Sequence, residues 1–231
     1  MTLAVPAAHG DRSDREVLGA LEEMVADPAY PCLGAKSVFR RDRVTHVVLD
    51  DMDSAATPEA LLKHLESFAE GGFDADGFHS FIASFRGPVH TDEAGFERSL
   101  FELLQELHDA DSAPWAPGVR SDPADPHFAF SVRGTAYFIV GLHPAASRVA
   151  RRAPLPTLVF NPHEQFERLR AEGRFDGMRT RIRARDEQLQ GSVNPMVADH
   201  GESSEARQYS GRFHDARWVP PLDVHEEETD R

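Results

Sequence analysis

Apolar residues recur along this chain at two spacings, one typical of helices and one typical of strands. Between residues 11 and 27 they recur every three or four positions, which predicts an amphipathic helix. Ser13, with Glu16 three residues later, is the signature of a capping box, so this helix is expected to begin at that serine. The helical spacing is clearest between residues 92 and 109, where one face is rich in Phe and Leu.

The rest of the pattern adds three more helices and a set of short strands. Helices are predicted over residues 57–69, 162–171 and 174–190, and strands over residues 45–52, 78–85 and 156–160. Residues 127–142 form two apolar runs around Arg133-Gly134, which predicts a β-hairpin. Residues 28–41 have turn residues at both ends and are assigned no element, and residues 110–126, with four prolines, are predicted to be a loop.

The order of these elements indicates the fold class. Strands and helices are mixed without strict β-α-β alternation, and no internal repeat or Gly- and Ser-rich linker divides them. The sequence therefore predicts a single α+β domain over residues 1–219, with a largely antiparallel sheet packed by helices. Residues 220–231 are acidic and are predicted to be a disordered tail.

Charge is distributed unevenly along the chain. The net charge of −14 argues against nucleic acid or an anionic membrane as the main partner. Residues 133–217, however, carry 14 arginines, no lysine and 10 acidic residues, a net charge of about +4 against about −18 for the rest. The basic groups therefore cluster where the unusual motifs lie.

Cysteine content and apolar runs narrow the class of protein. Cys32 is the only cysteine, which excludes an intrachain disulfide, a Cys-rich zinc site and an iron–sulfur cluster held by this chain alone. The first residues carry no signal-peptide pattern, and the longest apolar run, residues 137–142, is too short to cross a bilayer. We therefore expect a soluble, cytoplasmic protein. Common nucleotide-binding and hydrolase motifs are absent from the sequence.

Two histidines that follow predicted strands are candidates for chemistry. His143, in GLHPAASRVARR, lies at a strand end, where an imidazole can point into a cleft. His163 lies in FNPHEQFERLR, where Asn161 is expected to cap a helix, Pro162 to be its first residue and Glu164 to close a capping box. The helix dipole would disfavour an imidazolium there, leaving His163 able to bind a metal or accept a proton. Either histidine would equally suit a hydrogen-bonded structural role.

Two polar segments have both a functional and a structural interpretation. Four arginines between residues 179 and 185, Arg183 among them, alternate with small or apolar residues, so some are expected to point inward. The segment GESSEARQYSGR places Glu205, Tyr209 and Arg212 close together. The first segment would otherwise be a solvated, salt-bridged helix, and the second a buried Arg and Glu network.

Five long strings of the chain resemble the YqcI/YcgG family. They are PCLGAKSVF (31–39), FSVRGTAYFIVGLHPAASRVARR (130–152), PTLVFNPHEQFERLR (156–170), IRARDEQLQGSVNPMVADHG (182–201) and SEARQYSGR (204–212). These strings are nearly gapless and together span nearly the whole chain, so chance does not explain the agreement.

The resemblance implies a haem-dependent monooxygenase that N-hydroxylates a guanidine- or amine-containing, arginine-like small molecule. The cofactor would be non-covalently bound haem b, the further partners O2 and an external electron donor, and a homodimer is left open. Of the matched histidines, His143 and His163 become the candidate axial ligands. His143 is preferred because the preceding strand could fix its ring.

The resemblance also assigns roles to polar residues of the motifs. The cofactor-binding candidates are Arg148, Arg151, Arg152, Arg183 and Arg212, because a guanidinium donates two parallel hydrogen bonds to a carboxylate such as a haem propionate. The catalytic candidates are Glu164, Glu205 and Tyr209. Either glutamate would orient a cationic substrate group, and Arg207 or Arg212 a substrate carboxylate.

Alternatives to this hypothesis stay open at the level of sequence. The chain could be a non-catalytic haem-binding or sensing protein, or a non-haem iron oxygenase that uses His143, His163 and a carboxylate. Thiolate ligation by Cys32 is a further alternative. The family pattern often ends in W-x-C-P-F, whereas here Trp218 is followed by VPPL, so any role of that cysteine is missing from this chain.

Overall fold

The computed structural model describes residues 12–73, 77–90, 92–196, 202–215 and 217–224. The helices are α1 (Asp14–Ala26), α2 (Leu33–Arg40), α3 (Thr57–Glu70), α4 (Glu93–Ala110), α5 (His163–Ala171) and α6 (Phe175–Gln190), with two 3₁₀ turns, η1 (Val149–Arg151) and η2 (Glu205–Gln208). The strands are β1 (Val44–Asp51), β2 (Ser80–Gly87), β3 (Phe130–Val132), β4 (Thr135–Leu142) and β5 (Thr157–Pro162). None of the described helices is long and apolar enough to cross a membrane.

The described strands form one five-stranded sheet in the order β1-β2-β5-β4-β3. Only the β1–β2 pair is parallel, and the other three pairs are antiparallel. β3 and β4 are joined by Arg133 and Gly134, which both have positive φ, as a two-residue hairpin turn requires. The predicted α+β class, the single domain and the largely antiparallel sheet are therefore confirmed.

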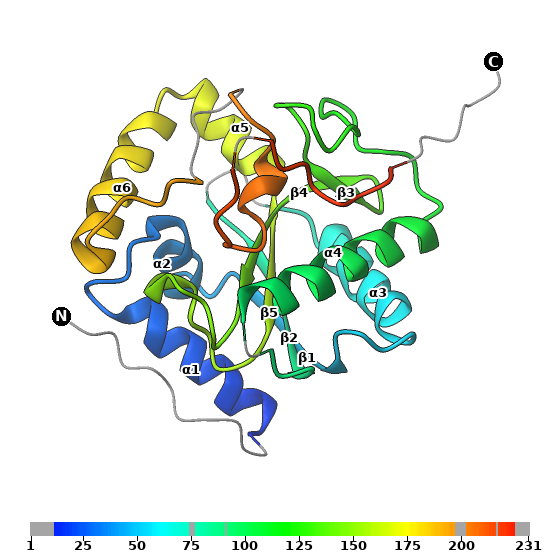
Figure 1. Cartoon of the computed structure of the whole chain (residues 1–231). Coiled ribbons are helices and arrows are strands. Elements are labelled where there is room, and N and C mark those ends of the chain that lie inside the picture. The colour runs from blue at the N-terminus through cyan, green and yellow to red at the C-terminus, as the bar shows by residue number, and fades with distance from the viewer. Residues whose placement is uncertain (1–11, 74–76, 91, 197–201, 216, 225–231) are drawn as a thin grey trace.

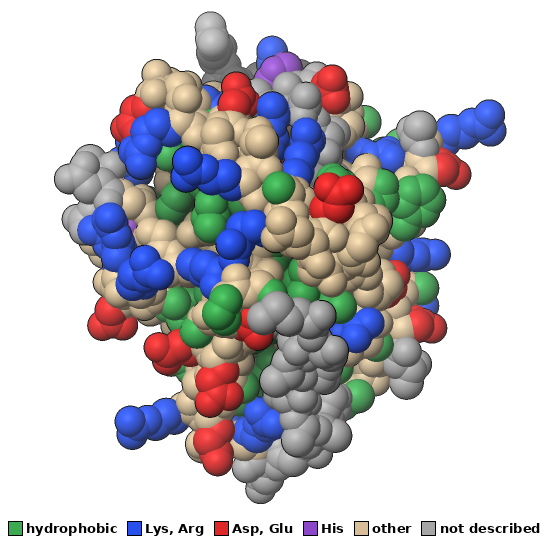
Figure 2. Space-filling model, turned by 90° about the vertical axis from the view of Figure 1, so that its left-hand side faces the viewer, with side chains coloured by type: hydrophobic (Ala, Val, Ile, Leu, Met, Phe, Trp, Pro, Cys, Tyr) green, Lys and Arg blue, Asp and Glu red, His purple; other side chains and the backbone are tan. Residues whose placement is uncertain are grey.

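Helices cover both faces of this sheet (Figure 1). One face packs against α1 and α2 through a small cluster that includes Leu21, Ile82 and Leu142, and α5 and α6 lie beside that face. From the side of α2 and α6, Lys and Arg side chains surround a hollow in which hydrophobic side chains are visible (Figure 2). This is the face that carries the candidate site.

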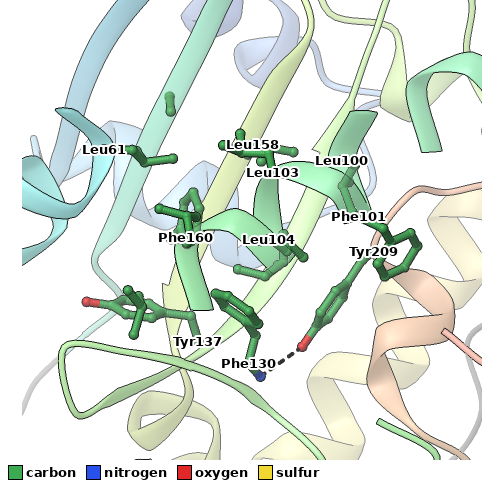
Figure 3. Close-up of a cluster of buried hydrophobic side chains, with 14 of the residues drawn as sticks. Leu61, Leu100, Phe101, Leu103, Leu104, Phe130, Tyr137, Leu158, Phe160 and Tyr209 are labelled. Carbon is green, nitrogen blue, oxygen red and sulfur yellow. Dashed lines mark hydrogen bonds between the residues drawn. The ribbon is translucent and has the colours of Figure 1, made fainter. Parts of the chain in front are cut away.

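The other face of the sheet carries the main hydrophobic core, formed with α3 and α4. Leu61 of α3 and Leu100, Leu103 and Leu104 of α4 pack there against buried strand side chains such as Phe160 (Figure 3). The core continues into the segment after η2, because Tyr209 is fully buried in it and its hydroxyl accepts the backbone N–H of Phe130 at 3.2 Å. This packing fixes the position of η2 relative to the sheet.

Most predicted elements are observed within a few residues of the expected bounds. The capping box that starts α1 is complete, with the Ser13 and Glu16 side chains each accepting the other residue's backbone N–H. α2 was not predicted, because it is eight residues long and buries only Val38. Cys32 caps its start, and the Cys32 Sγ accepts the N–H of Ala35. A helix this short offers too few buried positions for a period to be recognised.

Three local predictions for the start of α5 are wrong: the Asn161 cap, Pro162 as the first helical residue, and the capping box closed by Glu164. Asn161 does not cap α5; it lies in β5, where its side chain accepts from the Ser80 hydroxyl at 2.7 Å and donates to the Phe138 carbonyl at 3.1 Å. Pro162 is the residue that precedes the first turn, and no side chain caps this helix. The carboxyl end of β5 therefore continues directly into α5, which places His163 at the end of the central strand.

The C-terminal tail was predicted to be disordered from residue 220. Residues 220–224 instead lie against the domain, because Leu222 and Val224 pack on the main core and Asp223 exchanges backbone hydrogen bonds with the Gln105 side chain. The prediction is wrong for those residues. The remainder of the predicted tail, residues 225–231, lies outside the described residues.

Candidate functional site

A cavity of about 350 Å³ lies between helices α1, α2, α5 and α6 and the face of the sheet opposite the main core. This volume is in the range of small-molecule sites. Paired residues of neighbouring strands form the floor of the cavity. Phe138 pairs with Asn161 in one row, and Val140 pairs with Val159 in the next. One end of the floor is therefore polar and the other end apolar.

Apolar and aromatic side chains form most of the cavity wall. The helices and the segments beside them contribute Leu21, Met24, Val25, Tyr30, Val38, Phe39, Phe78, Phe166, Phe175, Met178 and Ile182. Phe166 connects the wall to the floor, because its ring lies 5.8 Å from that of Phe138 and 5.7 Å from that of Phe78. Such a wall favours a ligand with a large apolar body.

His163 is the cavity histidine that follows β5. Val159 and Asn161 of β5 face the cavity, and side chains alternate along a strand. His163, two positions after Asn161, therefore faces the cavity as well. Its side chain is largely buried between two carboxylates: Nε2 lies 3.6 Å from Glu205 Oε2, and Nδ1 lies 3.7 Å from Glu167 Oε1. An imidazole in this place can contact a bound ligand.

Glu205 lies beside His163 and also lines the cavity. The Tyr209 hydroxyl donates to its Oε1 at 2.8 Å. Burial raises the pKa of Glu205 to about 8, although the Tyr209 hydrogen bond and the charge of Arg170 both act in the opposite direction. The carboxyl group therefore holds a proton near neutral pH. Tyr209 does not line the cavity, so it positions Glu205 rather than touching a ligand.

Two arginines from the segment after β4 lie at the other end of the cavity. Arg148, which is 9% exposed, donates through Nη2 to Asp186 Oδ2 at 2.6 Å and to the Ser192 carbonyl at 2.7 Å. Arg151 donates to the carbonyls of Gly141, Gln208 and Tyr209, at 2.9 to 3.1 Å. Burial lowers the pKa of Arg151 to about 10, so it remains a cation at neutral pH.

Further arginines come from α5 and α6. Arg170 lies on the same face of α5 as His163 and Phe166, and its guanidinium lies over the Phe175 ring at 4.5 Å from the centroid. Arg179 and Arg183 lie on the cavity face of α6. Together with the two arginines after β4, they give an apolar cavity a strongly positive lining, which favours an anionic group on the ligand.

His143, the preferred ligand candidate, is not at the cavity. Phe138, Val140 and Leu142, the even positions of β4, face the cavity. Because side chains alternate along a strand, His143, which comes next, faces the main core. There the buried His143 ring stacks on Phe96 with centroids 4.4 Å apart, and neither ring nitrogen has a hydrogen-bond partner among the described residues. Burial lowers the pKa of His143 to about 4, so it is a neutral core residue.

Three other predicted site residues also lie away from the cavity. Arg152 donates to the carbonyls of Ala146 and Ser147 and so supports the loop after β4. Arg212 donates to Glu97 of α4 at 2.9 Å, on the core side of the sheet. Glu164 is exposed on α5 and does not line the cavity. Arg152 and Arg212 therefore hold other parts of the fold together, and Glu164 lies at the surface.

The non-haem iron alternative lacks a ligand cluster. Within the described part of the chain, no group of three or more His, Cys, Asp or Glu side chains is arranged to hold a metal ion. His143 and His163 lie on opposite faces of the sheet, so they cannot share one ion. Cys32 does line the cavity, but burial raises the pKa of its thiol, which disfavours the thiolate that metal ligation needs.

Sequence reasoning missed several residues of the site. Arg170 and Phe166 were in a quoted motif, and their spacing from His163 places all three on one helix face, a signal that was available. Asn161 was predicted to cap α5, whereas it lies in β5 and lines the cavity. Nothing in the sequence indicated that Asp186 would pair with Arg148, because the two are 38 residues apart.

The fold and the site define an α+β protein that encloses an apolar small-molecule cavity lined with arginines. The sequence profile of the YqcI/YcgG family matches residues 21–223, and the chain belongs to this family. The resemblance seen in the motif strings is therefore confirmed.

Two curated relatives are distant. One is named "Putative N(omega)-hydroxy-L-arginine synthase DcsA", from Streptomyces lavendulae, and is 25% identical over 166 residues, which are 66% of this chain and 60% of that protein. The other is named "Uncharacterized protein YqcI", from Bacillus subtilis (strain 168), and is 25% identical over 179 residues, 72% of this chain and 70% of that protein. The match thus spans less than two thirds of the Streptomyces protein. No solved structure matches the chain.

Proposed function

We propose that this protein is a haem-dependent monooxygenase that N-hydroxylates a guanidine- or amine-containing small molecule. One oxygen atom of O2 would enter the new N–O bond and the other would leave as water, with two electrons from an external donor and two protons. The name of the Streptomyces relative supports N-hydroxylation of a guanidine. The observation that carries the haem assignment is the chemistry of the cavity.

The cavity residues fit a haem in three respects. The wall is apolar and aromatic, as a porphyrin ring requires. His163 presents an imidazole at one end, the commonest protein ligand of haem iron. Arg148 and Arg183 present guanidinium groups to the cavity, and the cation of Arg151 adds positive potential, so the lining suits carboxylates. When bound, haem would supply oxygen activation, which side chains alone do not provide.

The residues of this chain would then bind, orient and shield. In our proposal His163 replaces His143 as the residue that would bind the haem iron, because of these two histidines only His163 faces the cavity. The apolar wall would exclude water from the reacting atoms. Glu205 would lose its proton when the cationic nitrogen group of the substrate lies beside it, and the carboxylate would then orient that group. Tyr209 would hold Glu205 through its 2.8 Å hydrogen bond.

The test is a hemin titration followed by absorbance in the Soret region. We expect the wild-type protein and His143→Phe to give the same shifted band, because Phe can stack on Phe96 and His143 does not face the cavity. We expect His163→Leu to lose the spectral features of histidine ligation. A complete spectrum in the His163 variant, or no band in the folded wild type, would contradict the proposal.

Turnover separates the enzyme from a binder. The reduced, haem-loaded protein is mixed with O2 and L-arginine or a related guanidine or amine, and products with one added oxygen atom are sought by mass spectrometry. Glu205→Gln should lower both substrate affinity and turnover. Haem binding without any hydroxylated product across a broad set of such compounds would favour the alternative, a non-catalytic haem-binding or sensing protein.

A further inference from the structure

Arg148 is nine-tenths buried on the cavity wall, yet only part of its guanidinium is used. All of its hydrogen bonds to described residues go through Nη2, to Asp186 and to the Ser192 carbonyl. Its Nε and Nη1 make none within the described part of the chain. A buried guanidinium with unused donors on a cavity wall indicates a binding site for a planar oxyanion.

The partner of Arg148 belongs to the helix that covers the cavity. Asp186 is the only residue of α6 that is buried. The cavity face of this helix repeats with helical spacing and consists of Phe175, Met178, Arg179, Ile182, Arg183 and Asp186. α6 therefore closes the cavity with little burial of its own, and the ion pair to Arg148 is one of its principal anchors.

Apart from Leu189, which packs partly buried against the small apolar cluster, the other contacts that hold α6 to the domain are hydrogen bonds. Arg185 donates through Nη2 to the Tyr30 carbonyl at 2.9 Å, and Gln190 Oε1 accepts the backbone N–H of Val149 at 2.8 Å. Polar contacts at a cavity edge exchange with water or ligand more readily than packed apolar surface does. The cover can thus move without disrupting the main core.

We propose that Arg148 is the carboxylate-binding group of this cavity and that a ligand carboxylate replaces Asp186 on it, releasing α6. Asp186 is chemically a carboxylate, so the exchange keeps the buried guanidinium paired at every stage. Movement of α6 would bring the released Asp186 carboxylate to water, so neither charge would stay buried and unpaired. The neighbouring Arg151 is committed to three backbone carbonyls and would add positive potential rather than a free donor fork. The ligand class is an apolar molecule with at least one carboxylate.

This inference rests on the proposed function only for its choice of probe, because haem carries two carboxylates. The test uses metal-free protoporphyrin IX and its dimethyl ester, followed by porphyrin fluorescence. Neither compound contains iron, so His163 ligation does not contribute. We expect the diacid to bind wild-type protein at least about tenfold more tightly than the ester, because charge-assisted hydrogen bonds to Arg148 are lost in the ester.

Variants assign that difference to one residue. Arg148→Met should reduce the preference for the diacid to near unity, whereas Arg152→Met should keep it, because Arg152 serves only loop carbonyls outside the cavity. Asp186→Asn should bind the diacid several-fold more tightly, because a competitor for Arg148 is weakened. Glu187→Gln, the adjacent exposed carboxylate of α6, is its matched control and should not change the affinity.

Release of α6 is tested by hydrogen–deuterium exchange. Without porphyrin, residues 175–190 should exchange faster in Asp186→Asn than in wild type, while α4 is unchanged. With saturating diacid the difference between the two proteins should disappear, because the pair of Arg148 with residue 186 is then absent in both. A difference that persists at saturation would overturn the exchange.

The failures of the two proposals are distinguishable. If hemin shows histidine ligation through His163 but diacid and ester bind equally to wild type, the carboxylate site is wrong and the haem proposal stands. If the diacid depends on Arg148 but hemin acquires no histidine ligand, the haem proposal fails and the carboxylate site stands. The comparison of diacid and ester needs no variant, so a poorly folding Arg148→Met protein does not weaken the test.

Discussion

The two histidines that follow strands β4 and β5 have opposite surroundings. His163 lies between two carboxylates at the cavity, and His143 stacks on Phe96 in the core with no hydrogen-bond partner among the described residues. A neutral buried imidazole with unused nitrogens is stable only while it stays unprotonated. His143 is therefore expected to act on stability rather than on chemistry.

The prediction for His143 concerns acid stability. Burial lowers the pKa of His143 from 6.5 to about 4 in the folded protein, so below pH 6.5 the unfolded chain takes up a proton that the folded chain does not. The free energy of unfolding should fall as pH drops from about 6.5 to about 4, by up to about 3 kcal/mol from this residue. His143→Phe should remove that part of the pH dependence, measured by urea unfolding at several pH values.

A matched substitution checks the cause of that change. His64 is exposed on α3, so His64→Gln should leave the pH dependence as in wild type. If His143→Phe keeps the wild-type slope, the residue is not a buried neutral histidine and its placement in the core is wrong.

At the scale of elements, β4 has to lie very close to α4 and to the segment after η2. A Cβ added at Gly141 would lie 2.7 Å from Phe96 Cε1, 2.8 Å from Leu100 Cδ1 and 2.8 Å from the Tyr209 carbonyl oxygen. The Gly141 N–H also donates to that carbonyl at 2.7 Å. Glycine is thus required here by close packing, and the same contact holds the Glu205 segment against the sheet.

Gly141→Ala is expected to lower the free energy of unfolding by about 1 to 3 kcal/mol, because a backbone carbonyl cannot yield as a flexible side chain does. Gly177→Ala on α6 is the control, since nothing lies within 4 Å of the added methyl group. That change should stabilise the helix by up to about 1 kcal/mol. Chemical denaturation measures both. Equal effects of the two substitutions would show that the close approach at β4 is wrong.

At the scale of the whole molecule, an acidic chain places five of its arginines around one cavity. The net charge is −14, yet five arginines line the site. The anionic surface elsewhere favours solubility, and the basic lining attracts an anionic ligand from solution. A ligand that fills this cavity should stabilise the entire domain, because the cavity is bounded by the sheet and four helices.

Hemin is therefore expected to raise the melting temperature. At a free concentration about a hundred times its Kd, binding to the folded state alone contributes about 2.7 kcal/mol, which for a domain of this size corresponds to a rise of about 5 to 10 °C. Differential scanning calorimetry measures the shift. His163→Leu should show a smaller one at the same hemin concentration. No shift in the wild-type protein would indicate that hemin does not occupy the cavity.

Much of the fold could be predicted from the sequence because its signals are local. The capping box at Ser13 and the two-residue turn at Arg133-Gly134 each act within a few residues, and both were observed as expected. α2 was missed because one buried residue gives no period, and Asn161 was misassigned because its partners lie on two neighbouring strands. Those partners come from other parts of the chain.

Most of the elements, the α+β class, the family and the two histidines after strands follow from the sequence alone. It did not decide which histidine meets the cavity, because that depends on strand register. Phe138 pairs with Asn161, so even positions of β4 share a face with odd positions of β5, and this places His143 and His163 on opposite faces. Register, helix placement and the pairing of Arg148 with Asp186 are contacts between distant segments, and only tertiary packing sets them.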